Sequence, residues 1–205
     1  MGTYSLKQEE LLRRYRSLHS EGGRVLFDDA PATFIGDELW TGDCFGKIAK
    51  KLFGMLEAHP GRVLDYGCGK ANYLKHLLPL GVRHLGWQLY DPGYALYSER
   101  PTLLSDYIVC TDVMEHVLDV DYVLEDIASL AKDGATLLFT ISGRSDRRAF
   151  IEDGQNMHVT VKPLLYWVEK MEEHFSGMEV HLIYNNDQFW DSNNPNVVTT
   201  RVPVK

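Results

Sequence analysis

Residues 62–70, Arg-Val-Leu-Asp-Tyr-Gly-Cys-Gly-Lys, constrain the fold of this chain more than any other stretch. A short apolar run ends at Asp65, Gly67 and Gly69 follow, and a segment with helical spacing comes after them. A strand, a tight glycine turn and a helix start in this order expose backbone that a ligand can approach. In an open α/β sheet, ligands bind at this carboxyl end of the strands. The segment therefore predicts either a binding cradle or a plain tight turn.

Two well-known phosphate-binding motifs do not fit this turn. Asn72 stands where the dinucleotide fingerprint has its third glycine. The turn also lacks the Gly-Lys-Ser/Thr ending of a phosphate loop. The sequence therefore does not favour phosphate cradling at this place.

Length and charge narrow the class of protein. The chain has 205 residues, 44% of them apolar, which suits one soluble domain with a sizeable core. Its formal net charge of -8 argues against a partner such as duplex DNA. Three cysteines without paired spacing indicate reduced thiols and predict a cytoplasmic protein. No stretch approaches the length of a membrane span, so we expect no membrane partner.

Apolar periodicity predicts alternating strands and helices after an amino-terminal region. We expect helices at 5–19, 43–58, 70–79, 119–131 and 162–175, and strands at 62–66, 84–90, 107–111, 135–141, 178–184 and 197–204. Such alternation predicts an α/β fold with a mostly parallel sheet and helices on both faces. A loop joins the last two strands, which predicts an antiparallel carboxyl-terminal edge.

The chain divides into two parts within a single compact domain. Residues 1–59 are expected to form amino-terminal helices and a loop at 24–42, and residues 60–205 the core. Gly36, Gly42 and Gly46 make this loop a candidate lid over a site. Simple packing of the amino-terminal part onto the sheet is the alternative.

Acidic residues follow three successive clear strands. Asp65, Asp91 and Asp112 each stand where a predicted strand ends. A single aspartate there is commonly a helix cap or a turn residue. Three of them at one edge of the sheet predict a ligand site. Asp91 lies 22 positions beyond Gly69, a spacing that suits an acid holding both hydroxyls of a ribose.

Three segments, at 63–69, 90–92 and 110–117, resemble motifs of the class I S-adenosylmethionine-dependent methyltransferases. The resemblance implies a Rossmann-like sheet and the cofactor S-adenosyl-L-methionine, with S-adenosyl-L-homocysteine as product. It implies transfer to an oxygen or nitrogen of a small-molecule, sugar or nucleotide-like acceptor. Residues 152–158 also resemble a segment of poorly characterised bacterial and phage methyltransferases. The residues implied in cofactor binding are Asp65, Tyr66, Gly67, Cys68, Gly69, Tyr90, Asp91, Pro92, Thr111, Asp112 and Val113.

One departure from this family concerns the stretch after the second strand. Only 15 residues separate Asp91 from Tyr107. A full helix, a strand and their turns do not fit in that length. We therefore expect a trimmed crossover that is irregular at 94–102, and the residue that contacts adenine stays unassigned.

A second group of residues suggests metal or acid–base chemistry. Asp112, Glu115 and His116 would share one face if 112–117 began a helix, and His158 follows a later strand on the same side. Two carboxylates and two imidazoles suit a divalent metal such as Mn, Zn or Fe. The set resembles that of the small-RNA terminal 2′-O-methyltransferases, although Asp112 stands where those enzymes have glutamate and the region around His158 matches loosely.

Two alternative functions follow beside the main one. The first is metal-assisted 2′-O-methylation of a terminal RNA ribose. The second is a non-catalytic S-adenosylmethionine-binding module, which the presence of Asp65, Gly67, Gly69 and Asp91 disfavours. Without a metal, Glu115, His116 and His158 remain candidate catalytic residues, with a histidine as general base or simply as pocket lining.

Overall fold

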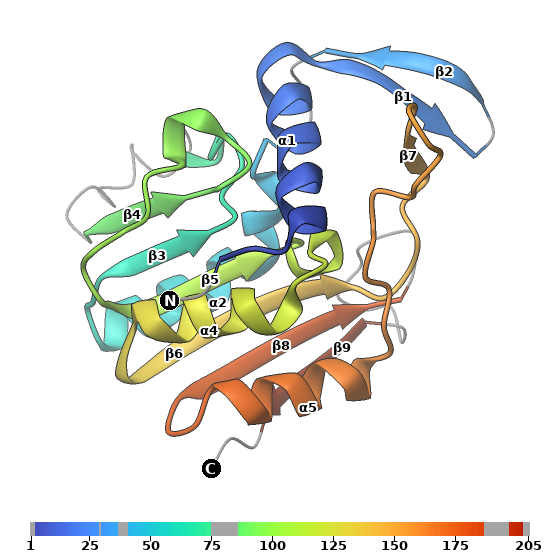
Figure 1. The fold of residues 1–205 in the computed structure, drawn as a ribbon. Helices are drawn as coiled ribbons and strands as arrows, with labels where there is room; N and C mark the ends of the chain where they lie inside the picture. The colour runs from blue at the N-terminus through green and yellow to red at the C-terminus, as the bar shows by residue number, and fades with distance from the viewer. Residues whose placement is uncertain (1–2, 29, 37–40, 75–85, 187–196, 203–205) are drawn as a thin grey trace.

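The computed structural model describes residues 3–28, 30–36, 41–74, 86–186 and 197–202, and within them a six-stranded sheet forms the centre (Figure 1). The strand order is β4-β3-β5-β6-β8-β9. Neighbouring strands run parallel except β9, which is antiparallel to β8 at the edge. The predicted α/β sheet with its antiparallel edge is confirmed. Its strands are β3 Val63–Tyr66, β4 Trp87–Tyr90, β5 Ser105–Thr111, β6 Ala131–Ser142, β8 Glu179–Asn185 and β9 Val197–Val202.

Helices cover both faces of this sheet (Figure 1). The helices α4 Val120–Leu130 and α5 Leu164–His174 pack on one face, and α2 Gly46–Ala58 packs on the other. The strands present alternate residues to the two faces, so Leu64 joins the cluster with Leu124 and Val63 joins the cluster with Leu52. The second half of the predicted helix 70–79 lies outside the described residues.

The connection from β4 to β5 is short, as expected. Between these strands the chain forms one short 3₁₀ helix, η4 Ala95–Tyr97, and is otherwise irregular. Ser105 then opens β5, two residues before the predicted start. The trimmed crossover is thus confirmed.

The amino-terminal region differs from the expectation. Helix α1 Leu6–Glu21 forms as predicted, but the loop expected at 24–42 is wrong in its first half. There β1 Gly23–Phe27 and β2 Ala30–Ile35 pair antiparallel, and β7 Arg148–Phe150 adds to β1. The third strand of this small sheet, β7, lies far along the chain from β1, so local periodicity does not predict their pairing.

Helix α1 lies across the carboxyl end of the main sheet (Figure 1). At its start, Ser5 donates from its amide and hydroxyl to the Asp119 carboxylate, at 2.5 and 2.9 Å. Further along, Arg14 pairs with Asp153 at 2.8 Å, and Arg16 donates to the Pro92 carbonyl at 2.8 Å. These contacts fasten α1 to α4, to the turn after β7 and to the loop after β4.

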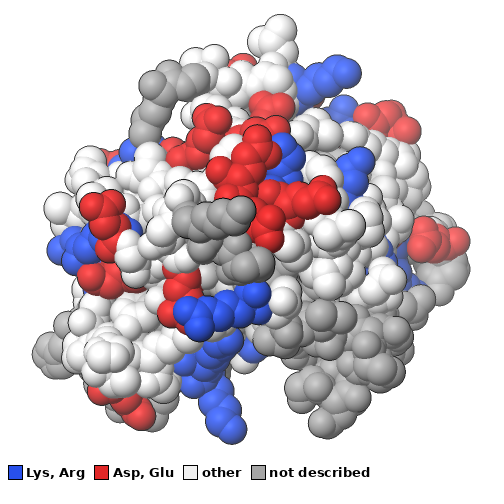
Figure 2. Space-filling model, turned by 90° about the horizontal axis from the view of Figure 1, so that it is seen from below, with Lys and Arg blue, Asp and Glu red and all other residues white. Residues whose placement is uncertain are grey.

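The surface view adds two observations. On the face in Figure 2 an acidic group lies in the upper centre, and basic side chains lie beside acidic ones rather than in one continuous surface. Among the described residues, no helix combines the length and apolar character needed to cross a bilayer.

Candidate functional site

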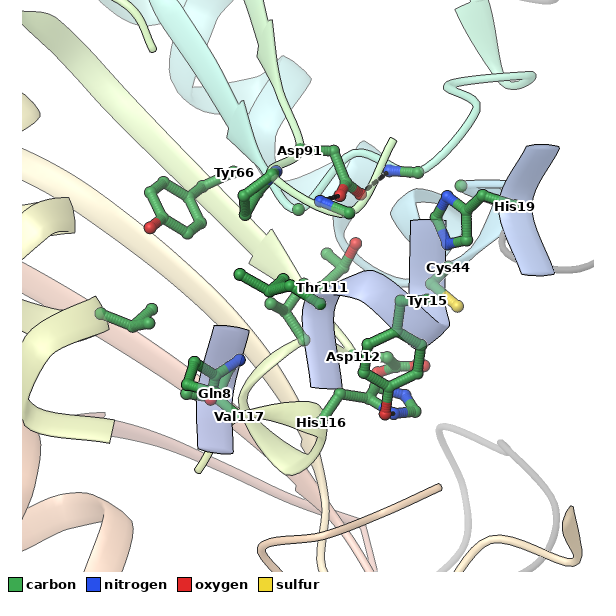
Figure 3. Close-up of a pocket in the computed structure, with 18 of the residues that line it drawn as sticks. Gln8, Tyr15, His19, Cys44, Tyr66, Asp91, Thr111, Asp112, His116 and Val117 are labelled. Carbon is green, nitrogen blue, oxygen red and sulfur yellow. Dashed lines mark hydrogen bonds between the residues drawn. The ribbon is translucent and has the colours of Figure 1, made fainter. Parts of the chain in front are cut away.

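A cavity lies at the carboxyl ends of β3, β4 and β5, beneath α1 (Figure 3). Its interior volume is about 110 Å³. The sheet contributes the glycine turn, the loop after β4 and the end of β5, and α1 contributes the roof. Predicted cofactor residues in its wall are Tyr66, Gly67, Gly69, Asp91, Pro92, Thr111, Asp112 and Val113.

The turn after β3 has a conformation that requires glycine. Gly67 has φ +77°, and a Cβ placed on it would lie 2.3 Å from a methyl carbon of Val113. Its amide donates to the Tyr90 carbonyl at 2.7 Å, which ties the turn to the end of β4. Backbone strain and contact with Val113 therefore both exclude a side chain here.

Asp91 is buried directly beside this turn. Its Oδ2 accepts from the Gly69 amide and its Oδ1 from the Gly93 amide, both at 2.7 Å (Figure 3). Burial raises the pKa of this carboxyl group to about 6, against the opposing effect of the two amides. Each oxygen keeps a lone pair after these bonds, so the group can still accept from ligand hydroxyls.

Asp65 is buried behind the turn rather than in the cavity wall. Its Oδ2 accepts from the Tyr73 hydroxyl, while Oδ1 has no hydrogen-bond partner among the described residues. Burial raises the pKa of Asp65 to about 7. An unpaired, buried acceptor is a place that a ligand cation or donor would stabilise.

Cys68 and Tyr90, two further predicted cofactor residues, also lie outside the cavity wall. The Cys68 thiol is buried and its Sγ lies 3.5 Å from the Gly69 carbonyl oxygen. The Tyr90 ring packs edge-on against Tyr66, with ring centroids 5.1 Å apart. Both residues support the wall from behind.

Asp112 lines the cavity at the end of β5 and forms an ion pair with Lys47. It has φ +52°, and its carboxylate forms an ion pair with Lys47 of α2 and accepts from the Thr140 hydroxyl at 2.6 Å. Burial opposes ionisation, but Lys47 and Thr140 outweigh it and lower the pKa of Asp112. Asp112 is therefore a carboxylate at neutral pH.

Glu115 points away from the cavity. It lies in the 3₁₀ helix η5 Met114–His116, is fully buried, and its Oε1 accepts from the Ser142 amide at 2.9 Å. Its Oε2 has no partner in the described part of the chain. Burial, aided by the nearby Asp112 charge, raises the pKa of Glu115 to about 8. The side chain is therefore mostly protonated at neutral pH.

His116 lines the cavity and is held by its Nδ1 atom. That atom lies 2.9 Å from the Met157 carbonyl oxygen and 3.1 Å from the Tyr15 hydroxyl, which itself donates to Met157 at 2.8 Å. Nδ1 must therefore carry the proton, which leaves a lone pair on Nε2. Burial and the neighbouring His158 lower the pKa of His116 to about 3 and keep the ring neutral.

His158 stands behind His116 rather than in the cavity wall. The two rings meet at 83° with centroids 4.8 Å apart. The Nδ1 of His158 lies 2.6 Å from the Arg144 carbonyl oxygen, and its Nε2 lies 3.5 Å from Asp146. His158 thus packs against His116 and fixes its position.

The four candidate metal ligands do not converge. In the part of the chain that the structure describes, no three of Asp112, Glu115, His116 and His158 offer ligand atoms within 4.8 Å of one another. The condition for a shared face, an α-helix that begins at 112–117, is not met, because η5 is a single 3₁₀ turn and Asp112 precedes it with positive φ. The spacing i, i+3, i+4 shares one face only in an α-helix. The metal site stays a prediction that this geometry does not support.

Residues 41–178 match the protein family described as "Methyltransferase domain". The chain belongs to this family. No curated protein and no solved structure matches it significantly. Methyltransferases of this family generally use S-adenosylmethionine. The cavity wall of this chain holds a glycine turn and the buried acid Asp91, and an unpaired carboxylate oxygen of Asp65 lies behind the turn.

Three residues of this methyltransferase site carried no signal in the sequence. Tyr15 lies on the buried face of α1 with Leu11 and Leu18, a spacing that is typical of core packing rather than of a site. Lys47 lies in the first turn of α2 without any motif, and only its ion pair with Asp112 reveals it. Gln8 is a polar residue that a helix normally exposes, yet its exposed fraction is 2%.

Proposed function

We propose that this methyltransferase transfers a methyl group from S-adenosylmethionine to an oxygen or nitrogen nucleophile of a small-molecule, sugar or nucleotide-like acceptor. One observation carries the proposal. The buried Asp91 carboxylate, the Gly67 turn and the His116 ring, whose Nε2 has no partner among the described residues, line one cavity beneath α1. A ribose could therefore be bound by Asp91, and a proton removed by His116, within the same cavity.

The residues of the turn and of β4 would hold the cofactor, which when bound supplies an electrophilic methyl group on a charged sulfur. The lone pairs of Asp91 would accept from the two ribose hydroxyls. The unpaired Oδ1 of Asp65 would accept, at the back of the turn, from the amino group of the methionine part. Gly67 and Gly69 would let that part approach the backbone.

His116 would act on the acceptor. Its protonated Nδ1 is held by the Met157 carbonyl, so the lone pair of Nε2 is the part of the ring left for a substrate proton. The lowered pKa keeps Nε2 unprotonated at neutral pH but makes it a weak base, so it would take the proton as the nucleophile becomes acidic on accepting the methyl group. Tyr15 and His158 would hold the ring in this orientation.

Calorimetric titration of the purified protein with S-adenosylhomocysteine tests the cofactor part of the proposal. We expect saturable binding with one site per chain. Absence of heat at millimolar ligand would refute the proposal.

Transfer from methyl-labelled S-adenosylmethionine to a panel of alcohols, amines, sugars, nucleosides and a short RNA with a free 3′ ribose tests the acceptor part. We expect label on a small acceptor, and a loss of transfer in His116→Gln without loss of S-adenosylhomocysteine binding. Label on the RNA alone would replace the proposal with terminal ribose methylation. Binding without transfer to any acceptor would favour the non-catalytic module.

A further inference from the structure

Tyr66 and Gln8 line the end of the cavity away from His116, which we call the closed end because three segments of the chain meet there (Figure 3). Tyr4 and Tyr66 both line the cavity there, and the Tyr66 hydroxyl donates to Asp126 of α4 at 2.9 Å. Arg100, from the trimmed crossover, pairs with the other oxygen of Asp126 at 2.7 Å. The amino-terminal segment, the crossover and α4 thus jointly close this end.

Gln8 of α1 projects a fixed donor toward this end. Its Oε1 accepts from the backbone amides of Leu118 and Asp119, at 2.7 and 3.2 Å. Because an oxygen must face those two amides, the orientation of the side-chain amide is determined. The Nε2 group has no partner among the described residues, and Figure 3 shows it pointing into the cavity. A side chain whose residue is only 2% exposed therefore aims an unpaired NH₂ group at any ligand there.

The chemistry of the closed end suits a flat ring with an acceptor atom on its edge. Its wall consists of the aromatic rings of Tyr4 and Tyr66 and the apolar side chains of Val117 and Val123. Because Oε1 of Gln8 is already occupied twice, the amide can only donate. A ring with an unprotonated nitrogen satisfies both conditions.

The position of the closed end relates it to the ribose site. Tyr66 is the register partner of Tyr90 on β4, and Asp91 follows Tyr90 directly. The closed end therefore begins beside the Asp91 carboxylate, which would hold the ribose. His116, the proposed base, lines the other end together with Asp112, so the methyl group would face that end. With the ribose at Asp91 and the methyl group at the His116 end, the adenine base attached to the ribose would lie in the closed end.

We propose that the closed end binds the adenine ring of the cofactor and that Nε2 of Gln8 donates a hydrogen bond to a ring nitrogen. The inference rests on the proposed function and extends it. Gln8 lies outside the matched residues 41–178, so the amino-terminal helix would supply the adenine contact that the trimmed crossover leaves unassigned.

Calorimetry with S-adenosylhomocysteine and its 1-deaza, 3-deaza and 7-deaza analogues tests the inference on the unaltered protein. Each analogue replaces one ring nitrogen by a C–H group that accepts no hydrogen bond. We expect one of the three to bind about tenfold more weakly than the parent ligand, because a hydrogen bond is lost and Nε2 is left unpaired. Equal affinity for all four ligands would overturn the inference.

The variant Gln8→Glu adds a second test. Glutamate keeps an oxygen for the amides of Leu118 and Asp119 but removes the NH₂ donor. We expect about tenfold weaker binding of S-adenosylhomocysteine, and no remaining penalty for the sensitive deaza analogue. Ser5→Ala is the matched control, because it weakens the tie between α1 and Asp119 without removing a donor from the cavity. We expect it to bind all four ligands with the same preferences as the unaltered protein.

These outcomes separate the inference from the proposed function. If the unaltered protein binds no S-adenosylhomocysteine, the proposed function fails. If it binds, but the deaza penalty persists in Gln8→Glu, the assignment of Gln8 fails while the proposed function stands. If Gln8→Glu does not fold, the three analogues on the unaltered protein still decide whether a ring nitrogen is recognised.

Discussion

At the scale of single residues, Gly67 links backbone conformation to the shape of the cavity. Its φ of +77° and its approach to Val113 act against any side chain. We expect Gly67→Ala to lower the free energy of unfolding by roughly 3 kcal/mol, through backbone strain together with steric overlap. Urea denaturation measures this loss.

Gly134→Ala is the control for that substitution. Gly134 has φ +72°, but a Cβ added there would meet no atom within 4 Å, so strain acts alone. We expect a loss of about 1–2 kcal/mol. Equal losses at the two positions would show that contact with Val113 has no part in the effect.

A substitution at Asp91 tests whether this carboxylate binds the ribose of the cofactor. Asn keeps the volume and one oxygen acceptor but brings an NH₂ group toward the amides of Gly69 or Gly93. We expect Asp91→Asn to weaken S-adenosylhomocysteine binding by about tenfold to a hundredfold, or roughly 1–3 kcal/mol. Unchanged affinity in calorimetry would contradict the ribose role.

At the scale of elements, η5 carries the buried Glu115, whose protonation affects the free energy of unfolding. The pKa of Glu115 is raised to about 8 in the folded chain, against 4.5 for an ordinary glutamate. The folded state therefore binds more protons than the unfolded state between these values. The contribution of Glu115 to stability is full below about pH 4.5 and falls progressively as the pH rises to about 8.

Glu115→Gln removes this titration. We expect the stability of the variant, relative to the unaltered protein, to rise between pH 5 and pH 8 by about 1–3 kcal/mol. Thermal unfolding at a series of pH values measures the difference. A constant difference across this range would mean that Glu115 is ionised in the folded chain.

Elements with regular local patterns were predictable from the sequence. Apolar periodicity predicts the core strands and the helices α1, α2, α4 and α5. The small number of residues between Asp91 and Tyr107 predicts the trimmed crossover. The pairing of β1 with β7 was not predictable, because it depends on contacts between distant segments. The metal site stays a prediction, which η5 does not support because the spacing of its candidate ligands requires an α-helix and η5 is a 3₁₀ turn.

At the scale of the whole molecule, the cavity belongs to two regions of the chain. Residues 41–178 match the methyltransferase family and supply the floor, whereas α1 lies before them and supplies the roof. The roof residues Gln8 and Tyr15 were hidden in the sequence, because only the packing of α1 on the sheet brings them to the cavity. The glycine turn and Asp91 were predictable because a compact motif encodes them.

The central claim is that this cavity holds S-adenosylmethionine with its ribose at Asp91. A crystal structure of the protein with S-adenosylhomocysteine tests it most directly. We predict ribose hydroxyls within hydrogen-bond distance of the Asp91 carboxylate and the sulfur at the end lined by Asp112 and His116. A ligand bound outside the cavity, or one whose ribose does not contact Asp91, would contradict the claim.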